Sequence, residues 1–278
     1  LHDPAAPAPA WRLGMRGRLL SVRRLIALAA VALLACIALG LAPLPAEQDL
    51  AAAFAAPGAA HPLGTDDLGR DLLHQVALGL RTSLALGLGA TAIALLLGLG
   101  IGLAAGMGSA LQDEVLMRGA DVVASLPALL LAILVAALFG GSTVALAWVL
   151  GLTRWPLVAR LVRVEVASLR EREFVLAARA LGASPWRIAR VHLLPHAATV
   201  ARAALGILFG GAVVSEAALA FVGLGDPAVV SLGQLAASGF GFVTHAPWMW
   251  AAPVVVIVVL TASVAALGDA LVDQDGGA

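Results

Sequence analysis

Long apolar stretches, separated by short polar segments, run through most of the sequence. A helix needs about 20 apolar residues to cross the hydrocarbon core of a bilayer. Lipid-exposed sheet is excluded, because its open backbone cannot be satisfied in hydrocarbon. We therefore predict an all-α integral membrane protein with six transmembrane helices, at residues 25–44, 76–105, 120–139, 144–162, 198–222 and 248–267.

Residues 171–196 (EREFVLAARALGASPWRIARVHLLPH), which we call the island, are charged although apolar stretches adjoin them on both sides. Acidic residues at the start suit the positive end of a helix, and Gly182 can take the positive φ that often ends one. Ser184 and Pro185 suit the N-cap and first position of a second helix. The pattern predicts two short helices joined by a tight turn, with Pro195 ending the second.

Apolar residues of the island recur at helical spacing. We expect Phe174, Ala177, Ala178 and Leu181 to form one apolar face, which Trp186, Ala189 and Leu193 continue. Such a short helix suits the groove of a partner protein, and the alternative is an amphipathic loop on lipid headgroups. The helix–turn–helix plan is also similar to that of DNA-binding proteins. Nucleic acid is nevertheless disfavoured as a partner, because the adjoining spans would keep the helix out of a major groove.

Arginine is unevenly distributed among the polar segments. Five arginines lie in residues 1–24 and eight in or beside the island, whereas residues 45–75 hold one and residues 223–247 none. The positive-inside rule places the arginine-rich segments in the cytoplasm. We predict a cytoplasmic N-terminal segment (1–24), a transmembrane domain (25–272) and a cytoplasmic tail (273–278). Within the domain, 45–75 and 223–247 are predicted external loops, and 166–197 a cytoplasmic loop.

Composition excludes several classes of site. Of the 278 residues, 61% are hydrophobic and 12% are charged, and the net charge is zero. All 17 basic residues are arginine, so a P-loop ATP site, which needs a lysine, is excluded. Cys36 is the single cysteine, which leaves no internal disulfide and no cysteine-rich zinc site. We expect no catalytic residue, metal or cofactor in this chain. The bias toward Ala, Leu, Gly and Arg indicates a GC-rich bacterial genome. With the cytoplasmic side assigned by the positive-inside rule, we expect the protein in a bacterial cytoplasmic membrane.

Glu216 lies deep within the predicted fifth span. A carboxylate there is costly and usually faces a partner or a water-filled path. A role in a translocation path and a structural hydrogen bond both remain open. We expect Arg154, Asp121 and Asp269 to lie nearer span ends, where they can reach water or pair. Three glycines at i, i+4 spacing suit close helix packing; they are Gly98, Gly102 and Gly106.

A polar run in the first predicted external loop has its own chemistry. Its glycines permit tight turns, and its acids can form ion pairs with arginine. Two interpretations stay open, a self-braced loop and a surface that contacts a binding protein or shapes the pore mouth. The residues concerned are Thr65, Asp66, Asp67, Gly69, Arg70 and Asp71.

The island resembles the EAA loop of permease subunits of ABC importers. The matching positions are Ala177, Ala178, Gly182, Leu194 and Pro195. Two positions depart from the family pattern, since Leu176 stands where the family has Glu and His192 where it has a hydrophobic residue. In the family, this loop is the coupling helix that docks in a cleft of the ATPase subunit, and Glu173 is a candidate to supply the acid here.

Further motifs resemble one branch of these permeases. Residues 61–71 (HPLGTDDLGRD) resemble a segment of the dipeptide, oligopeptide and nickel permeases, in the second permease of the pair. Residues 221–225 (FVGLG) and 231–233 (SLG) resemble the stretch after the fifth span, with Leu232 in place of Trp. The resemblance covers roughly residues 62–269 and three motifs in the family's order.

The resemblance implies the type I importer permease fold and an extended set of partners. It implies a homologous second permease, two ABC ATPase subunits that carry ATP and Mg, an extracytoplasmic substrate-binding protein and membrane lipid. The implied substrates are peptides, nickel or metal–chelator complexes. The residues implied in ATPase coupling are Glu173, Ala177, Ala178, Leu181, Gly182, Ala183, Ser184, Pro185, Trp186 and Arg187. The alternative is a stand-alone secondary transporter or channel, which would need paired charges in several spans and inverted repeats that are not evident.

Overall fold

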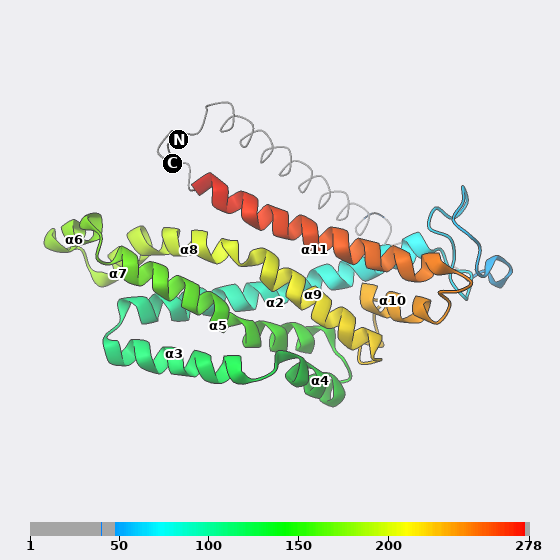
Figure 1. The fold of residues 1–278 in the computed structure, drawn as a ribbon, viewed down its shortest axis with the longest axis horizontal. Coiled ribbons are helices and arrows are strands. Elements are labelled where there is room, and N and C mark those ends of the chain that lie inside the picture. Colours follow the sequence, from blue (N-terminus) through cyan, green and yellow to red (C-terminus); the bar gives the residue numbers. More distant parts are fainter. Residues whose placement is uncertain (1–39, 41–47, 276–278) are drawn as a thin grey trace, which may run out of the picture.

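The computed structural model describes residue 40 and residues 48–275, and residues 48–275 form an elongated bundle of helices (Figure 1). The predicted segment 1–24 and the predicted span 25–44, apart from residue 40, lie outside the described residues. The longest helices are α2 (Leu72–Met107), α5 (Thr143–Leu169) and α11 (Pro247–Asp275). The others are η1 (Leu50–Ala52), α3 (Ala110–Ser125), α4 (Ala128–Phe139), α6 (Glu173–Ala180), α7 (Pro185–Ile188), the π-helix η2 (Ala189–Leu193), α8 (Leu194–Ala203), α9 (Leu205–Phe221) and α10 (Leu232–Phe240).

The all-α class is confirmed in the described part of the chain, where one isolated bridge, Thr65 to Asp71, is the sole β-type pairing. Three of its helices are long and apolar enough to cross a membrane. If each of two bent helix pairs is also counted as one span, there are five candidate spans. The bent pairs are α3 with α4 and α7–α8 with α9. These five spans correspond to the second to sixth predicted spans.

The contact between α2 and α5 is built on small residues. Gly98, Gly102 and Gly106 are buried along one face of α2. A Cβ at Gly102 would lie 2.6 Å from the carbonyl oxygen of Ala159 and 2.7 Å from the Cβ of Val162. The two backbones therefore approach more closely than any larger residue would permit, as the i, i+4 spacing predicts.

The third predicted span is broken. Instead of one helix over residues 120–139, α3 ends at Ser125 and α4 begins at Ala128, with a bend of 69°. Pro127 has no N–H to donate to the preceding turn and disfavours helical geometry at the residue before it. Leu126 is accordingly extended, with φ −79° and ψ 125°. The prediction of a single helix was wrong because one proline outweighed the apolar pattern.

The fifth span is also bent, and it starts earlier than predicted. Pro195 does not end the island helix but lies in the first turn of α8. The π-helix η2 precedes it, and the N–H of Leu194 donates to the carbonyl of Ala189, five residues back. This wider turn relieves the clash that a proline causes in a regular helix. A further bend of 44° follows at Ala204, between α8 and α9.

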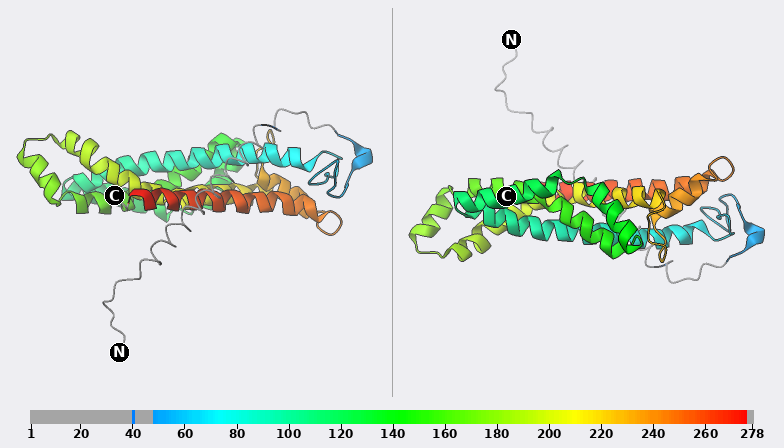
Figure 2. Two further views of the ribbon diagram at one scale, coloured as in Figure 1. Left: turned by 90° about the horizontal axis from the view of Figure 1, so that it is seen from above. Right: turned by 90° about the horizontal axis from the view of Figure 1, so that it is seen from below.

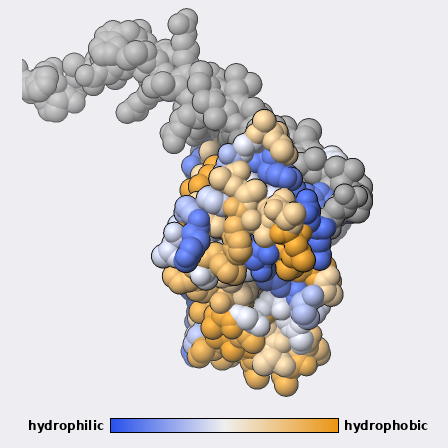
Figure 3. All heavy atoms as spheres, turned by 90° about the vertical axis from the view of Figure 1, so that its right-hand side faces the viewer, coloured by the Kyte–Doolittle hydropathy of each residue, from blue (hydrophilic) through white to orange (hydrophobic). Residues whose placement is uncertain are grey.

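The two ends of the bundle differ in character. The helices α6 and α7 project at one end, which we call the island end, and residues 48–71 lie at the other, the loop end (Figures 1 and 2). Seen from the loop end, the lower part, where α4 lies, is mostly hydrophobic, whereas hydrophilic residues gather higher up (Figure 3). The arrangement places the island and the predicted external loop at opposite ends of the spans.

Replacing Gly102 by alanine is expected to lower the free energy of unfolding by about 1–3 kcal/mol, because the added methyl overpacks the α2–α5 contact. Gly100→Ala is the matched control, since nothing lies within 4 Å of a Cβ there. The control should be neutral or slightly stabilising, because alanine favours helix over glycine by about 1 kcal/mol. Thermal unfolding of the purified protein in detergent measures both. Equal melting temperatures for the two variants would contradict the packing argument.

The predicted orientation can be tested in a background where Cys36 is replaced by serine. Asp67→Cys, at the loop end, should react with a membrane-impermeant maleimide in cells whose cytoplasmic membrane is intact and whose outer envelope has been made permeable to the reagent. Arg190→Cys, at the island end, should react only after the cytoplasmic membrane is permeabilised. Both native side chains are exposed, so accessibility depends on the side of the membrane. The reverse labelling pattern would show that the orientation is wrong.

Candidate functional site

The island has the predicted helix–turn–helix plan. After α6, Gly182 takes a φ of +80°, which a glycine adopts without strain. The hydroxyl of Ser184 then accepts a hydrogen bond from the N–H of Arg187 at 3.3 Å, and Pro185 is the first residue of α7. The predicted turn and N-cap are thereby confirmed.

One face of the island is buried against the bundle. Val175, Ile188 and Leu193 are each at most 2% exposed. They share a hydrophobic cluster with Leu169, at the end of α5, and Met107, at the end of α2, packs against that cluster. The island is therefore attached to the ends of the two central helices by side-chain packing as well as by the chain itself.

The other face carries large apolar side chains that are exposed. Leu181 is 89% exposed and Trp186 is 72% exposed, and Phe174 and Leu176 are also exposed. The predicted apolar face is thus divided. Phe174, Ala177 and Leu181 of the predicted apolar face are exposed and Ala178 is half-buried, whereas Val175, which the pattern did not select, is the buried residue of α6.

A groove of about 790 Å³ lies between the two island helices. Its lining combines small residues, which keep it open, with Phe174 and Leu181 at its walls. Most of the predicted coupling residues contribute to it, and Glu173, Pro185 and Trp186 lie on the exposed surface around it. The lining residues are Phe174, Ala177, Ala178, Leu181, Gly182, Ala183, Ser184, Arg187 and His192.

At the loop end, Asp66 organises the predicted polar run. Its Oδ1 accepts hydrogen bonds from the N–H groups of Leu68 at 2.9 Å and Arg70 at 2.8 Å. Its Oδ2 accepts from Nε of Arg70 at 2.6 Å, and Asp66 is only 4% exposed. This carboxylate binds its own loop, which supports the self-braced interpretation.

The remaining residues of the run have similar local partners. Thr65 is fully buried and donates to the carbonyl of Ala52 at 2.5 Å. Asp71 caps α2 by accepting from the N–H groups of Leu73 and His74, and its other oxygen pairs with His61 at 2.9 Å. Gly69 has a φ of +72°, and a Cβ there would collide with Asp49. The predicted four-member ion cluster is therefore reduced to Asp66 with Arg70, while Asp67 is exposed and takes no part.

Glu216 is 4% exposed and lies between α9 and α2. The hydroxyl of Ser83 donates to its Oε2 at 3.4 Å, a long hydrogen bond. Among the described residues, no cation forms an ion pair with it. In the isolated chain its contacts are those of a buried structural carboxylate.

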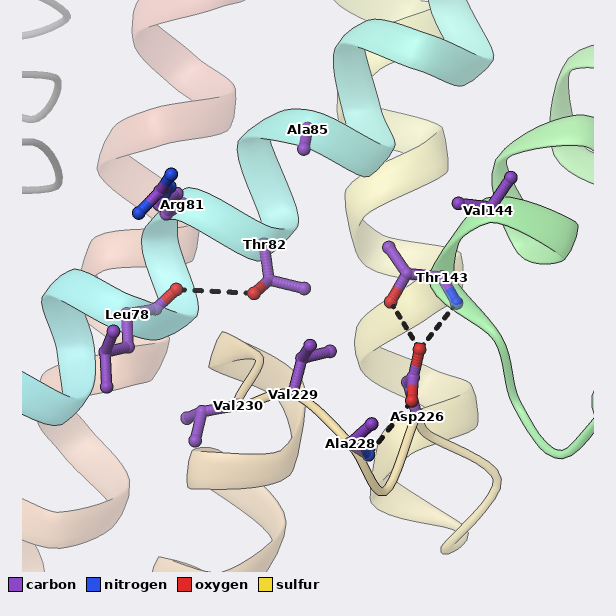
Figure 4. Close-up of a pocket in the computed structure, with 10 residues that line it drawn as sticks. All are labelled: Leu78, Arg81, Thr82, Ala85, Thr143, Val144, Asp226, Ala228, Val229 and Val230. Carbon is purple, nitrogen blue, oxygen red and sulfur yellow. Dashed lines mark hydrogen bonds between the residues drawn. The ribbon is translucent and has the colours of Figure 1, made fainter. Parts of the chain in front are cut away.

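Sequence reasoning missed a pocket of about 600 Å³ near the loop end (Figure 4). Arg81 and Thr82 of α2 line one side, and Thr143 and Asp226 line the other. In the sequence, Asp226 directly follows the FVGLG motif, and this position was the signal that could have identified it as a functional residue. Arg81 is exposed and forms no side-chain ion pair with another described residue.

Asp226 caps α5 from a distant part of the chain. Its Oδ2 accepts from the backbone N–H of Thr143 at 3.0 Å and from the hydroxyl of the same residue at 3.2 Å. The backbone hydrogen bond from Thr143 is the main cause that lowers the pKa of Asp226 below its ordinary value. The N-cap residue of α5, Ser142, makes no side-chain cap of its own, so Asp226 supplies the missing acceptor.

Comparison with known proteins gives a consistent result. Residues 97–274 match the family described as binding-protein-dependent transport system inner membrane component. The dipeptide transport system permease protein DppC of Alkalihalophilus pseudofirmus is 35% identical over 220 residues, which cover 78% of this chain and 72% of the relative. The oligopeptide transport system permease protein OppC of Mycobacterium bovis is 33% identical over 270 residues, covering 92% and 93%.

The fold also matches a solved transporter. The inward-facing MetNI methionine ABC transporter contains a chain that superposes with a TM-score of 0.57 at 22% identity. The match covers 72% of this chain and 95% of that chain. At this identity the likeness concerns the fold alone.

Asp226→Asn is expected to lower the free energy of unfolding at pH 7 by about 1 kcal/mol, because a neutral amide oxygen replaces the charged acceptor and hydrogen bonds to charged groups are stronger by about that amount. Because the native pKa is lowered, the stabilisation is present above the ordinary carboxyl pKa of about 3.9 and is lost as the pH falls through the lowered value. Melting temperatures between pH 7 and pH 3 should therefore show the gap between wild type and variant closing at the acid end. Asp67→Asn, at an exposed acid without a partner, is the control and should show no gap. A gap that is independent of pH would contradict the assignment.

Proposed function

Since the chain belongs to the family of binding-protein-dependent transport system inner membrane components, we propose that it is the permease subunit of an ATP-driven importer of peptides. We further propose that the island is the surface on which a separate ATPase subunit docks. The exposed apolar side chains around the island groove carry this second proposal.

Leu181, at the end of α6, and Trp186, in α7, are 89% and 72% exposed, and these two helices project at the island end of the bundle (Figure 1). Large apolar groups that adjoin a groove mark contact sites in soluble regions. Tryptophan is also among the residues that most often dominate binding energy at interfaces. Arg187 in the lining adds a charge that fits an acidic or carbonyl-rich cleft. Leu176, where the family has Glu, is exposed, so the acid would come from Glu173.

The attachment of the island to the bundle supports a role in transmitting movement. Val175 and Leu193 pack with Leu169 of α5, and the guanidinium of Arg170 donates to the carbonyls of Gly106 and Gly108 at the end of α2. Packed side chains transmit a displacement with little loss. An ATPase that moves the island would therefore move α2 and α5 with it, rocking the spans between inward-open and outward-open states.

The proposed assembly follows from what this chain lacks. Without lysine it has no P-loop, so ATP and Mg are assigned to two ATPase subunits. A homologous second permease would complete the translocation path, and an extracytoplasmic binding protein would deliver substrate at the loop end. Lipid surrounds the spans, and nucleic acid is not a partner. The location is a bacterial cytoplasmic membrane, with both termini in the cytoplasm.

Peptides are the proposed substrates, because relatives of this chain are named as dipeptide and oligopeptide permeases. Nickel and metal–chelator complexes are the alternatives from the sequence motifs. Purification of the complex with its binding protein, followed by identification of the bound molecule, distinguishes them. Uptake by this chain alone, without ATP or an ATPase, would instead support a secondary transporter or channel.

Replacing Leu181 by serine and Trp186 by alanine together should weaken ATPase association by about tenfold or more, since each loss at a central contact costs about 1–2 kcal/mol or more. Coupled ATPase activity and uptake should fall in parallel. Both side chains are exposed, so melting temperature should change little. Trp148→Ala, at a tryptophan of α5 that is 54% exposed, is the matched control and should retain the ATPase. Full association of the double variant would disprove docking at the island.

A further inference from the structure

Arg154 is a cation inside a membrane span, and it has no acidic partner among the described residues. One terminal nitrogen of its guanidinium, Nη2, donates to the carbonyl of Gly211 at 2.8 Å and to the hydroxyl of Ser215 at 2.9 Å, both on α9. Its Nε is buried and has no acceptor among the described residues. No carboxylate of the described chain forms an ion pair with it.

Two other arginines of α5 show that this situation is specific to Arg154. Arg160 pairs with Asp121 at 2.6 Å, and Arg163 binds Asp113 with two hydrogen bonds. Both acids come from α3. The helix thus carries three arginines, and the one with no acid is the deepest.

The depth of Arg154 contradicts the expectation that it lies near a span end. At about 1.5 Å per residue, it lies roughly 17 Å along α5 from Thr143, near the middle of a helix of 27 residues. An arginine side chain cannot reach either surface of a hydrocarbon core about 30 Å thick from there. A charge at that depth ordinarily faces a partner or a water-filled path.

Arg154 lines a pocket of about 410 Å³ where the two bent spans meet. Leu126, Pro127 and Ala128, at the break between α3 and α4, form one wall. Leu208, one turn beyond the bend between α8 and α9, also lines it. Interrupted helices near the middle of the membrane are typical of substrate sites in transporters, and the volume suits a small organic group.

We propose that Arg154 is part of a mid-membrane subsite that binds a carboxylate of the transported molecule. A guanidinium offers planar, paired N–H donors that match a carboxylate. Lipid headgroups are excluded as the source, because they lie about half the bilayer thickness away. This inference rests on the proposed function, and the carboxylate is that of a peptide, at its C-terminus or on an acidic side chain.

Gly211 and Ser215 act as positioning residues in this proposal. A Cβ at Gly211 would lie 2.2 Å from a terminal nitrogen of Arg154, so the absence of a side chain makes room for the guanidinium. Ser215 donates in turn to the carbonyl of Gly211 at 2.7 Å, which fixes its oxygen toward the arginine. α9 therefore holds the guanidinium on one edge and leaves other donors for a ligand.

The test compares uptake of trialanine with uptake of trialanine amide, which lacks the carboxylate. The complete importer is reconstituted in proteoliposomes with ATP, and the binding protein is loaded with each peptide at a concentration above its separately measured Kd. Arg154→Gln should lower the ratio of acid to amide uptake at least tenfold relative to wild type. Arg154→Lys keeps the charge but loses the paired donors, so its ratio should lie between those of Arg154→Gln and wild type. Arg118→Gln, at an exposed arginine paired with Glu114 on α3, is the control and should leave the ratio unchanged.

Two results would overturn the subsite while leaving the proposed function intact. One is an equal fall of both rates in Arg154→Gln, as expected from a purely structural tie between α5 and α9. The other is an unchanged ratio. If Arg154→Gln does not assemble, Ser215→Ala removes one of the two anchors and should shift the ratio, and an unchanged ratio there also overturns the subsite. Absence of ATP-driven uptake of either peptide by wild type would overturn the proposed function and the subsite with it.

Discussion

The close contact between α2 and α5 determines where the other elements lie. Gly98, Gly102 and Gly106 bring the two backbones together, with Val158, Val162 and Val166 seated against the glycines. Inside the hydrocarbon core there is no hydrophobic driving force between helices, so this contact depends on van der Waals packing between closely approaching backbones. Because the two helices are fixed along most of their length, their island ends form one platform, on which the buried face of the island packs.

Among the described residues around α2 and α5, the polar groups near the ends of the spans have partners that the polar group in the middle lacks. Toward the island end, arginines of α5 are matched by acids of α3, and Arg170 occupies carbonyls at the end of α2. At the loop end, Asp226 satisfies the start of α5, and Asp71 the start of α2. These polar groups therefore find their partners within the chain. Arg154, between these two zones, keeps unused donors, and it lies where two spans are broken.

The sequence was sufficient for features that depend on local chemistry. Apolar length predicted the spans, and Gly182, Ser184 and Pro185 predicted the island turn with its cap. The spacing of three glycines predicted close packing. The sequence could not locate the break at Pro127 within an apolar run, nor the π-turn that carries the helix past Pro195. A proline is a local signal that a helix is disturbed, but Pro127 breaks its helix while Pro195 is carried through a wider turn, and the choice between these outcomes depends on the neighbouring helices.

By itself, the sequence determined the class of protein, and it predicted the candidate spans and the island as a candidate partner-binding segment. These follow from the free energy of transferring side chains between water and hydrocarbon, which each segment expresses alone. The tertiary structure decided which island residues are buried and which are exposed, that Asp226 caps α5, and that Arg154 has no acid. Those facts depend on pairs of residues distant in sequence, such as Thr143 with Asp226 and Arg154 with Ser215. Those pairs come together only because α5 packs against α9 and against the loop that follows α9.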